Sequence, residues 1–362
     1  MQMKCVCRSW KTLISDPFFI KLHLKKQSTR NTTHFALLHR DKFHSSLSVV
    51  SIPVSHLREC RSLPIAHSNY PYYQLGSKFS CTIVGSCNGL ICLQSYDSLY
   101  LWNPATRTQS QPLCSYHKPL YKYWVAFGYD NSTDTYKVVV LSFKIEFNRI
   151  EDNQVSPTVR VLTFGDNIWK DIQSFPVVIL NGLTCSNEQS GVYLNNSVNW
   201  LVRCPYYCHL KNVTIKRFVI ISLDLGTETY TQFLLPRCWE APKPLSHSTS
   251  LCVLMDCLCF SYNFEKSNFD LWQMKKFGVE ESWTQFLKIR NLNLQVRIYG
   301  INDFRLTPLC LYEDGDILIF AINCREEAIY YDWRNNRVMR IINTKKMFYT
   351  AKGYSESLVS TC

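Results

Sequence analysis

The chain has 362 residues, which is enough for one large all-β domain or for two average domains. Its hydrophobic fraction of 46% and its aromatic fraction of 14% exclude a disordered protein, because the chain can fill a substantial core. The net charge is +12, and the first 62 residues hold 11 Lys and Arg against 3 Asp and Glu. Such a local excess is compatible with a nucleic-acid or acidic-membrane surface, but it is more often the solvated face of helices and a linker, so we expect no nucleic-acid partner.

The 17 cysteines are scattered without paired spacing, and the N-terminal segment has no uninterrupted apolar run with a small-residue cleavage site. We therefore expect a reduced, intracellular protein of the cytoplasm, the nucleus or both. No apolar run approaches the roughly 18 residues that cross a bilayer, since even "LCVLMDCLCF" is interrupted by Asp256, and no membrane partner is expected.

The first predicted element is a short amphipathic helix near the N-terminus. It carries large apolar side chains at i, i+4, i+7 and i+8, which form one stripe: Val6, Trp10, Leu13 and Ile14. Asp16-Pro17 closes this helix, because proline disfavours helical geometry in the residue before it. A helix of about ten residues is marginal alone in water, so the stripe needs a partner that covers it.

From about residue 33 onward, short runs rich in Val, Ile, Tyr, Phe and Trp alternate with Asn, Asp, Gly and Pro turns. The runs form a repeated unit of three or four strands. Five residues start equivalent second strands, at spacings of 60, 60, 50 and 59: Leu99, Val159, Val219, Phe269 and Ala328. The connections are too short for crossover helices, so each unit is an antiparallel meander.

Meanders arranged radially cover one another, which predicts an all-β, kelch-like β-propeller. A weaker sixth unit, "HFALLHR" with "LSVVSI", precedes the five, and the final "GYSESLVS" is a candidate outer strand for it. We expect about six blades, with seven blades or an open sandwich as alternatives. The equivalent turns at 103–107, 224–228 and 332–336 begin with Asn or Asp, whose side chains accept hydrogen bonds from amides two or three residues on. These residues are expected to be architectural.

Several segments in order resemble a known plant family: "VGSCNGLICL", "LWNPATR", "FGYDNSTDTYKVV", "GVYLNNSVNWLVR", "IISLDLGTETY", "FDLWQMKKFGVEESWTQFLKI" and "YSESLVS". They are similar to plant F-box proteins with an F-box associated (type 1, kelch-like) domain. The opening "KCVCRSWKTLISDPFFIKLHL" resembles the last third of an F-box, with its preceding leucine- and proline-rich helices outside this sequence. The resemblance implies an F-box remnant at residues 1–24, a basic linker at 25–33 and a propeller-like domain at 34–362.

The resemblance also implies partners. The F-box of the family docks on a Skp-type adaptor and, through it, on a cullin-based ubiquitin ligase. The residues of this remnant that would carry adaptor contacts are Val6, Cys7, Trp10, Leu13 and Ile14. The Gly-Gly pair of a true kelch blade is not found, so the F-box associated domain is the better description.

The chain carries no recognisable catalytic constellation, since it lacks a phosphate-binding G-x-x-x-x-G-K-[ST] loop, a G-x-S-x-G elbow and an H-E-x-x-H pair. "GSCNG" around Cys87 precedes a strand rather than a helix, so a buried or turn cysteine is a better interpretation than a nucleophile. "EDGD" at 313–316 is interpreted as an exposed turn. We expect a non-catalytic protein without a cofactor.

Two segments superficially resemble metal sites. "CPYYCH", with Cys204, Cys208 and His209, lacks the fourth ligand that structural zinc usually needs, and Cys257 and Cys259 only share one face of an apolar strand. "DNSTD" at 130–134 begins like a calcium loop but lacks the glycine and the final acid, which favours a hairpin turn. No metal site is predicted.

The leading hypothesis is a substrate receptor of an SCF-type ligase, in which the propeller binds a target protein for ubiquitination and proteasomal degradation. The alternative is a stand-alone binding module or decoy without ligase coupling, and a propeller hydrolase is a third class. Binding residues concentrate on loops, and the long connections near 142–156, 204–216 and 238–248 are candidates. Among their large aromatic residues we single out Tyr206, Tyr207 and Trp239, which either contact a target or cap the core.

Overall fold

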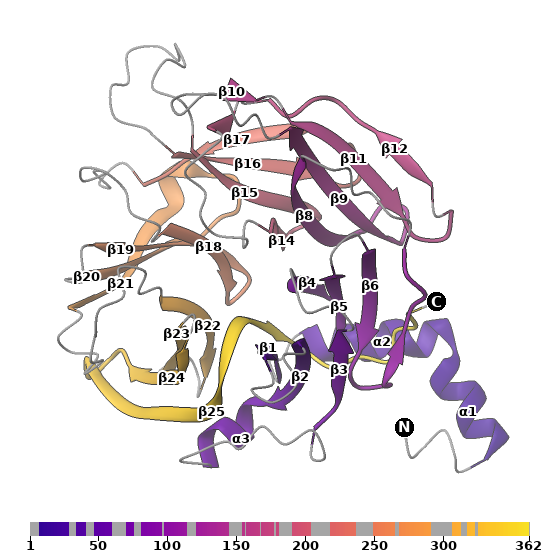
Figure 1. Cartoon of the computed structure of the whole chain (residues 1–362), viewed down its shortest axis with the longest axis horizontal. Coiled ribbons are helices and arrows are strands. Elements are labelled where there is room, and N and C mark those ends of the chain that lie inside the picture. Colours follow the sequence, from indigo (N-terminus) through magenta and orange to yellow (C-terminus); the bar gives the residue numbers. More distant parts are fainter. Residues whose placement is uncertain are drawn as a thin grey trace. The chain divides into compact units, whose positions relative to one another are not determined.

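The structure is a computed structural model, and it consists mainly of antiparallel strands (Figure 1). It describes residues 7–28, 34–40, 47–59, 70–75, 81–95, 98–113, 121–144, 154–155, 157–166, 168–176, 179–180, 190–203, 218–236, 249–264, 268–290, 306–312, 317–322 and 325–361. The chain divides into two compact units, Met1–Tyr116 with Pro308–Cys362, and His117–Thr307. Each unit is described by itself.

The first unit contains the helices and two sheets. Its elements are α1 (Arg8–Ser15), α2 (Pro17–Ser28), β1 (His34–Arg40), β2 (Leu47–Pro53), α3 (Val54–Glu59), β3 (Tyr72–Leu75), β4 (Cys81–Cys87), β5 (Leu90–Ser95), β6 (Ser98–Asn103), β7 (Thr108–Gln109), β22 (Leu306–Tyr312), β23 (Ile317–Ile322), β24 (Arg325–Asp332) and β25 (Arg337–Tyr354). Seven strands form one sheet in the order β22-β23-β24-β25-β1-β2-β3, and four form another in the order β4-β5-β6-β7. The seven-stranded sheet joins the last meander of the chain to the first.

The second unit contains the remaining strands. They are β8 (Tyr121–Asp130), β9 (Thr135–Lys144), β10 (Gln154–Val155), β11 (Thr158–Thr163), β12 (Trp169–Asp171), β13 (Ile179–Leu180), β14 (Val192–Leu194), β15 (Ser197–Arg203), β16 (Phe218–Asp224), β17 (Tyr230–Leu234), β18 (Thr249–Leu254), β19 (Cys257–Phe264), β20 (Asn268–Met274) and β21 (Trp283–Arg290), with a 3-10 turn at Glu280–Ser282. They form three four-stranded sheets, β12-β11-β9-β8, β14-β15-β16-β17 and β18-β19-β20-β21, and the small pair β10-β13.

The predicted repeat is present, and one detail of it is corrected. The described strands form six meanders of three or four strands each, three in each unit. All five residues used to measure the period are buried and occupy the same place in their meanders: Leu99, Val159, Val219, Phe269 and Ala328. That place is the third strand rather than the second, because a strand that the sequence pattern left outside each unit comes first.

The long strand β25 explains how the two ends of the chain meet. Its first part pairs with β24, and its second part pairs with β1, where Gly353 lies opposite Phe35 and Tyr354 opposite His34. The predicted contribution of "GYSESLVS" to the first meander is therefore confirmed for its first two residues. The residues after Tyr354 leave the sheet as an extended segment.

That C-terminal segment is held against the sheet β4-β5-β6-β7. The amide of Asn103 donates hydrogen bonds to the carbonyl oxygens of Ser357, at 3.1 Å, and Val359, at 2.7 Å. The hydroxyl of Ser86 donates to the carbonyl oxygen of Gly353 at 2.9 Å. These bonds satisfy backbone groups that would otherwise be buried without partners, since Ser357 and Val359 are both buried.

Apolar side chains from facing sheets fill the core. In the second unit, one cluster joins β8, β9 and β11 to β15 and β16 through residues such as Ala126, Val139 and Trp200. A second cluster joins β16 and β17 to β19, β20 and β21 through Ile220, Phe260 and others. The middle meander of this unit, β14-β15-β16-β17, is thus covered on both faces, as expected where meanders pack side by side.

Candidate functional site

The N-terminal helices carry the residues that the sequence assigns to adaptor binding. Helix α1 begins after Cys7, which is extended, and ends at Ser15, as predicted. Asp16 is also extended, and its carboxylate accepts a 2.9 Å hydrogen bond from the amide of Phe19. Asp16 therefore ends α1 and caps α2, a second helix that starts at Pro17, where proline lacks the amide that the first turn would leave unpaired.

Most of the predicted apolar stripe on α1 is open to solvent. Ile14 is buried, with 7% of its surface exposed, but Trp10 is 44% exposed and Leu13 is 51% exposed. Cys7 is exposed as well, and Val6 lies outside the described residues. The predicted partner that covers this stripe is thus found only for Ile14.

Helix α2 adds two apolar residues that sequence reasoning missed. Phe18 and Leu22 are 70% and 52% exposed, and their i, i+4 spacing puts them on one face of the helix. We call Trp10, Leu13, Phe18 and Leu22 the N-terminal apolar residues. The described residues 7–28 contain five Lys and Arg but a single acid, Asp16. The two helices therefore combine exposed apolar groups with positive charge, a combination that marks interaction surfaces when it is concentrated in one place.

The target-binding candidates Tyr206, Tyr207 and Trp239 lie outside the described residues, and so does most of the connections that contain them. The strand ends that flank these connections are described. The connection at 142–156 begins inside β9, which ends at Lys144, and contains β10, which pairs with β13. The connection at 204–216 follows β15, and that at 238–248 lies between β17 and β18.

Three tight turns define the opposite end of the same sheets. The turn 131–134 joins β8 to β9, the turn 195–196 joins β14 to β15, and the turn 225–229 joins β16 to β17. Strands β9, β15 and β17 each start at one of these turns and run away from it. The three candidate connections therefore all leave from the strand ends remote from the tight turns.

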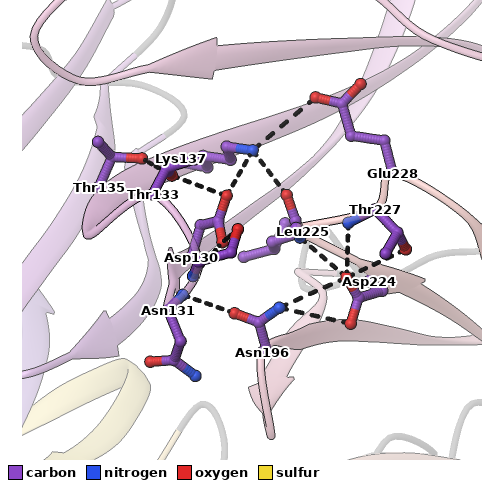
Figure 2. A network of polar contacts seen from close by, with 12 residues as sticks. Asp130, Asn131, Thr133, Thr135, Lys137, Asn196, Asp224, Leu225, Thr227 and Glu228 are labelled. Atoms are coloured by element: carbon purple, nitrogen blue, oxygen red, sulfur yellow. Dashed lines mark hydrogen bonds and ion pairs between the residues drawn. The ribbon is translucent and has the colours of Figure 1, made fainter.

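A network of polar contacts fixes the tight turns to one another (Figure 2). Lys137 on β9 donates a 2.6 Å hydrogen bond to the carbonyl oxygen of Leu225 and lies 2.9 Å from the carboxylate of Asp130. Its ammonium group is also 3.8 Å from Glu228, which in turn pairs with Lys170 at 2.6 Å. The Asp130 side chain is fully buried, so this is an ion pair with little solvent screening.

Asn196 completes the network from the β14-β15 turn. Its side-chain oxygen accepts a 2.7 Å hydrogen bond from the amide of Asn131, and its carbonyl oxygen accepts one of 2.8 Å from the amide of Leu225. Its side-chain amide reaches the carboxylate of Asp224 at 3.4 Å (Figure 2). One asparagine thus connects the β16-β17 turn of its own meander with the β8-β9 turn of the neighbouring meander, which links the two sheets.

The acids of this network have perturbed pKa values. Burial alone would raise the pKa of Asp130, but hydrogen bonds from Ser132, Lys137 and Thr133 outweigh it and hold the pKa well below its usual range. Burial would likewise raise the pKa of Asp224. Hydrogen bonds from Thr227, Asn196 and Gly226 outweigh this effect, so the pKa of Asp224 is lowered. Both groups are therefore carboxylates that accept hydrogen bonds, which is the state of structural residues rather than of proton donors.

The turn residues act as the sequence predicts. Asn103 accepts hydrogen bonds from the amides of Ala105 and Thr106, Asp224 from those of Gly226 and Thr227, and Asp332 from that of Asn335. Asp130 does the same for Ser132, so "DNSTD" is a hairpin turn between β8 and β9. In each of these turns the fifth residue is left-handed: Arg107, Asp134, Glu228 and Asn336, with φ between 52° and 58°.

The cysteines near the predicted motifs are placed in strands. Cys87 is buried at the end of β4, before a two-residue turn and β5, and burial raises the pKa of its thiol, which is the opposite of what a nucleophile needs. Cys257 and Cys259 lie on one face of β19, as predicted. Cys204, Cys208, His209 and the segment 313–316 lie outside the described residues. Among the helices that the structure describes, none is long and apolar enough to span a membrane.

The F-box associated beta propeller domain matches this chain over residues 42–361. The F-box/kelch-repeat protein At3g23880 of Arabidopsis thaliana is 28% identical over 346 residues, which cover 92% of this chain and 86% of that protein. The F-box protein CPR1 of the same plant is 25% identical over 97% of this chain and 82% of its own length. A solved chain of the nidogen/laminin complex has a TM-score of 0.43 at 10% identity, covering 89% of this chain and 99% of that chain.

The family match agrees with the fold and with the motifs that suggested it. Its region begins within the first meander and runs through the C-terminal segment that Asn103 holds. The six meanders of the described strands agree with the predicted six-bladed, all-β propeller. The chain belongs to the F-box associated beta propeller domain family, and its relatives are plant F-box proteins.

Proposed function

We propose that this chain is the substrate-recognition subunit of an SCF-type ubiquitin ligase. Its N-terminal helices would dock on a Skp-type adaptor and, through it, on the cullin, while the propeller holds a target protein for ubiquitination and proteasomal degradation. The observation that supports this best is the match to F-box proteins across almost the whole chain. The N-terminal apolar residues are exposed side chains that an adaptor could contact.

Adaptor binding would bury the side chains that α1 leaves in solvent. Trp10 and Leu13 are the strongest candidates, because both are large and about half exposed. Complete burial of one such side chain contributes about 1.5–3 kcal/mol. Ile14 would act indirectly, since it is already buried and holds the helix in place. Val6 belongs to the same stripe in the sequence, and Cys7 follows it directly.

Target binding would use the three connections that leave two of the sheets at the ends remote from the tight turns. We propose Tyr206, Tyr207 and Trp239 as contact residues, because large aromatic side chains contribute most to protein interfaces. The polar network of Asp130, Lys137 and Asn196 supports this role, since it braces the opposite ends of two of the sheets. Loops on a braced scaffold lose less conformational freedom when they bind.

The contribution of such a receptor to the reaction is proximity. It needs no catalytic residue of its own, because other subunits of the ligase carry the transferred ubiquitin. Holding an acceptor lysine close to that ubiquitin raises its effective concentration. The low pKa values of Asp130 and Asp224 accord with this, since neither acid is poised to donate a proton near neutral pH.

The alternative is a binding module or decoy that captures a target without ligase coupling. The two functions share the propeller and differ only in the N-terminal helices. Co-purification of a plant Skp-type adaptor with the 362-residue chain separates them. Capture supports the receptor, and the lack of capture supports the uncoupled module.

The variants Trp10→Ala and Leu13→Asp make this test specific. Both residues are exposed, so the changes leave the fold intact, and Leu13→Asp should abolish capture of the adaptor. Met339→Asp is the matched control, because Met339 on β25 is an apolar residue of comparable exposure. Equal capture by Leu13→Asp and by Met339→Asp would overturn the assignment of this helix as the docking surface.

The target side needs a second test. Quantitative mass spectrometry would compare proteins that the chain and its Tyr206→Ala/Tyr207→Ala/Trp239→Ala variant retain from plant extract. A target that depends on these residues is lost from the variant while the adaptor is still captured. If the retained proteins are the same, these aromatic residues serve the core instead.

We also propose that the protein works in the cytoplasm, the nucleus or both. The support is that the seven cysteines whose state the structure describes are free thiols, as expected in a reducing compartment. A fluorescent fusion imaged in plant cells tests this. Signal confined to the secretory pathway would contradict it.

A further inference from the structure

The hairpin β18-β19 brings two cysteines directly opposite one another. In its antiparallel register Cys252 lies opposite Cys259, and Cys257 lies two residues from Cys259 on the same face. Directly opposed residues of an antiparallel pair have Cα atoms about 4.5–5.5 Å apart. Disulfides form across Cα separations of about 4.4–6.8 Å. The backbone of this hairpin therefore already has the spacing that a cross-strand disulfide requires.

The side chains of the pair also meet. All three thiols are free, and a hydrogen bond between Cys252 and Cys259 is the foremost reason that the pKa of the Cys259 thiol is raised, followed by burial. The Cys259 thiol also contacts the carbonyl oxygen of Cys257 at 3.5 Å. The register places the two thiols directly opposite one another on the same face of the hairpin.

The two thiols differ in access. Cys259 is buried, with 1% of its surface exposed, whereas Cys252 is partly exposed. A small oxidant from solution can therefore reach Cys252 first, while Cys259 is shielded beside it. This is the arrangement of an attacking thiol and a resolving thiol in proteins that respond to oxidation.

We propose that Cys252 and Cys259 form an oxidation site that takes hydrogen peroxide and closes a reversible disulfide across the β18-β19 hairpin. The Cys252 sulfur attacks one peroxide oxygen, the O–O bond breaks, and sulfenic acid and water form. As the Cys259 sulfur then attacks the Cys252 sulfur, the S–O bond breaks and the departing oxygen takes the proton of the Cys259 thiol, so a second water leaves and no separate Cys259 thiolate has to form beforehand. Two thiols lose two hydrogens, and hydrogen peroxide is reduced to two waters.

The disulfide would tie the second half of β18 to β19. Strand β18 starts at Thr249, directly after the connection that contains Trp239, so the cross-link lies in the strand that follows a segment proposed for target binding. The oxidation site itself does not depend on that proposal, because it rests on the register and contacts of the hairpin alone.

The test uses the full 362-residue chain treated with hydrogen peroxide and then digested with a protease that cleaves before aspartate. Cleavage before Asp256 separates Cys252 from Cys257 and Cys259, so the disulfide alone joins the two peptides. Tandem mass spectra that fragment between Cys238 and Cys252 and at Leu258 show which upstream and which downstream cysteine is linked. We expect a Cys252–Cys259 link that dithiothreitol removes.

Single variants provide the controls. The cross-link should persist in Cys257→Ala and disappear in Cys252→Ala and Cys259→Ala. A link to Cys257 in the unmodified chain, or peroxide treatment that leaves both thiols unlinked, would overturn the proposal. Because fragmentation at Leu258 already assigns the partner in the unmodified chain, the result stands even if Cys259→Ala fails to fold.

Discussion

Lys137 on β9 donates a 2.6 Å hydrogen bond to the carbonyl oxygen of Leu225, which lies in the turn between two strands of the neighbouring sheet. The ammonium group that makes this bond is buried together with the carboxylate of Asp130. A buried ammonium group needs both a counter-ion and hydrogen-bond acceptors, and here the two come from different meanders. The contacts of Lys137 therefore connect two sheets, and they also give its buried ammonium group both a counter-ion and a hydrogen-bond acceptor.

Replacing Lys137 by methionine should be strongly destabilising, because it leaves Asp130 buried without its cation. Breaking such a pair from one side typically costs about 3–5 kcal/mol of unfolding free energy. The double variant Asp130→Asn/Lys137→Met removes both charges and should lose less than Lys137→Met alone. Urea unfolding followed by tryptophan fluorescence measures both values.

Lys170→Met is the matched control for that experiment. Lys170 pairs with Glu228 at the edge of the same network, but its side chain is two-thirds exposed, so the change should cost less than about 1 kcal/mol. If Lys137→Met costs no more than Lys170→Met, the buried pair contributes nothing to stability and the connection between the sheets depends on apolar packing.

The same network predicts how stability depends on pH. The pKa of Asp130 is lower in the folded protein than its value of about 3.9 in an unfolded chain, so the unfolded chain binds more protons in acid. This contribution is fully present above about pH 4 and is lost as the pH falls below that value. The urea midpoint of unfolding should therefore fall by more between pH 5 and pH 3 in the unmodified chain than in Asp130→Asn.

Asp171→Asn tests whether that difference is specific. Asp171 pairs with Arg160, but its side chain is largely exposed, so this variant should lose as much stability in acid as the unmodified chain does. An equal response of Asp130→Asn and Asp171→Asn would mean that other carboxylates cause the acid sensitivity.

The sequence predicts the meanders well because their signals are local. Strand patterning, turn residues and the repeat spacing all depend on neighbours within a few positions, and the structure confirms them. The helix end at Ser15 follows from Pro17 for the same reason, whereas helix α2 has a mixed distribution of apolar side chains and is not predicted. The prediction that Leu99 and its equivalents lie on the second strand of each meander is also wrong. They lie on the third strand, because each meander begins one strand earlier than the sequence pattern indicated.

The contacts between meanders cannot be predicted in the same way. The segment "NPATR" identifies Asn103 as a turn residue, but the bonds of Asn103 to Ser357 and Val359 span more than 250 residues. Likewise, "DNSTD" predicts a turn at Asp130 without indicating that Lys137 reaches Leu225. A local pattern identifies the residue that caps a turn. The partners of that residue's remaining hydrogen-bond donors depend on tertiary packing, which a local pattern does not show. The aromatic target candidates depend on loop conformation, which no short pattern encodes.

A glycine in the β4-β5 turn gives a third prediction. Gly89 is left-handed, and a Cβ there would lie 2.3 Å from the hydroxyl oxygen of Ser357 and 2.8 Å from its backbone nitrogen. Gly89→Ala should therefore both strain the turn and displace the C-terminal segment. We expect a lower melting temperature and faster amide exchange at Ser357 and Val359.

Gly165→Ala separates the two causes. Gly165 also has a positive φ, but a Cβ there would meet nothing within 4 Å, so this variant reports backbone strain alone, about 1–3 kcal/mol. The excess cost of Gly89→Ala is the contact with Ser357. If both variants lose the same unfolding free energy and amide exchange at Ser357 is unchanged, the C-terminal segment moves aside without cost.

The amide of Asn103 gives a fourth prediction. Aspartate at this position would still accept the hydrogen bonds of Ala105 and Thr106, so the turn should survive. It cannot donate to the carbonyl oxygens of Ser357 and Val359, and it would put a negative charge beside them. Asn103→Asp should lower the unfolding free energy by about 2–3 kcal/mol and expose the C-terminal segment to carboxypeptidase.

Asn131→Asp is the control for that change of charge. Asn131 is exposed in a turn, and its backbone amide rather than its side chain makes the bond to Asn196, so the substitution should be close to neutral. If Asn103→Asp resists carboxypeptidase as well as Asn131→Asp does, the two amide bonds do not hold the segment.

The β18-β19 turn gives the last prediction, in which a substitution should stabilise the protein. Met255 and Asp256 are both left-handed, with φ of 49° and 53°, a conformation that asparagine and glycine adopt more easily. The double substitution Met255→Asn/Asp256→Gly should therefore raise the unfolding free energy by about 1 kcal/mol in urea titrations. The comparable change Asn196→Gly, in a turn of the same geometry, should instead destabilise the protein, because the side chain of Asn196 bonds to Asn131 and Asp224. Stabilisation by both changes would show that the network contributes less than the backbone strain of its own turn.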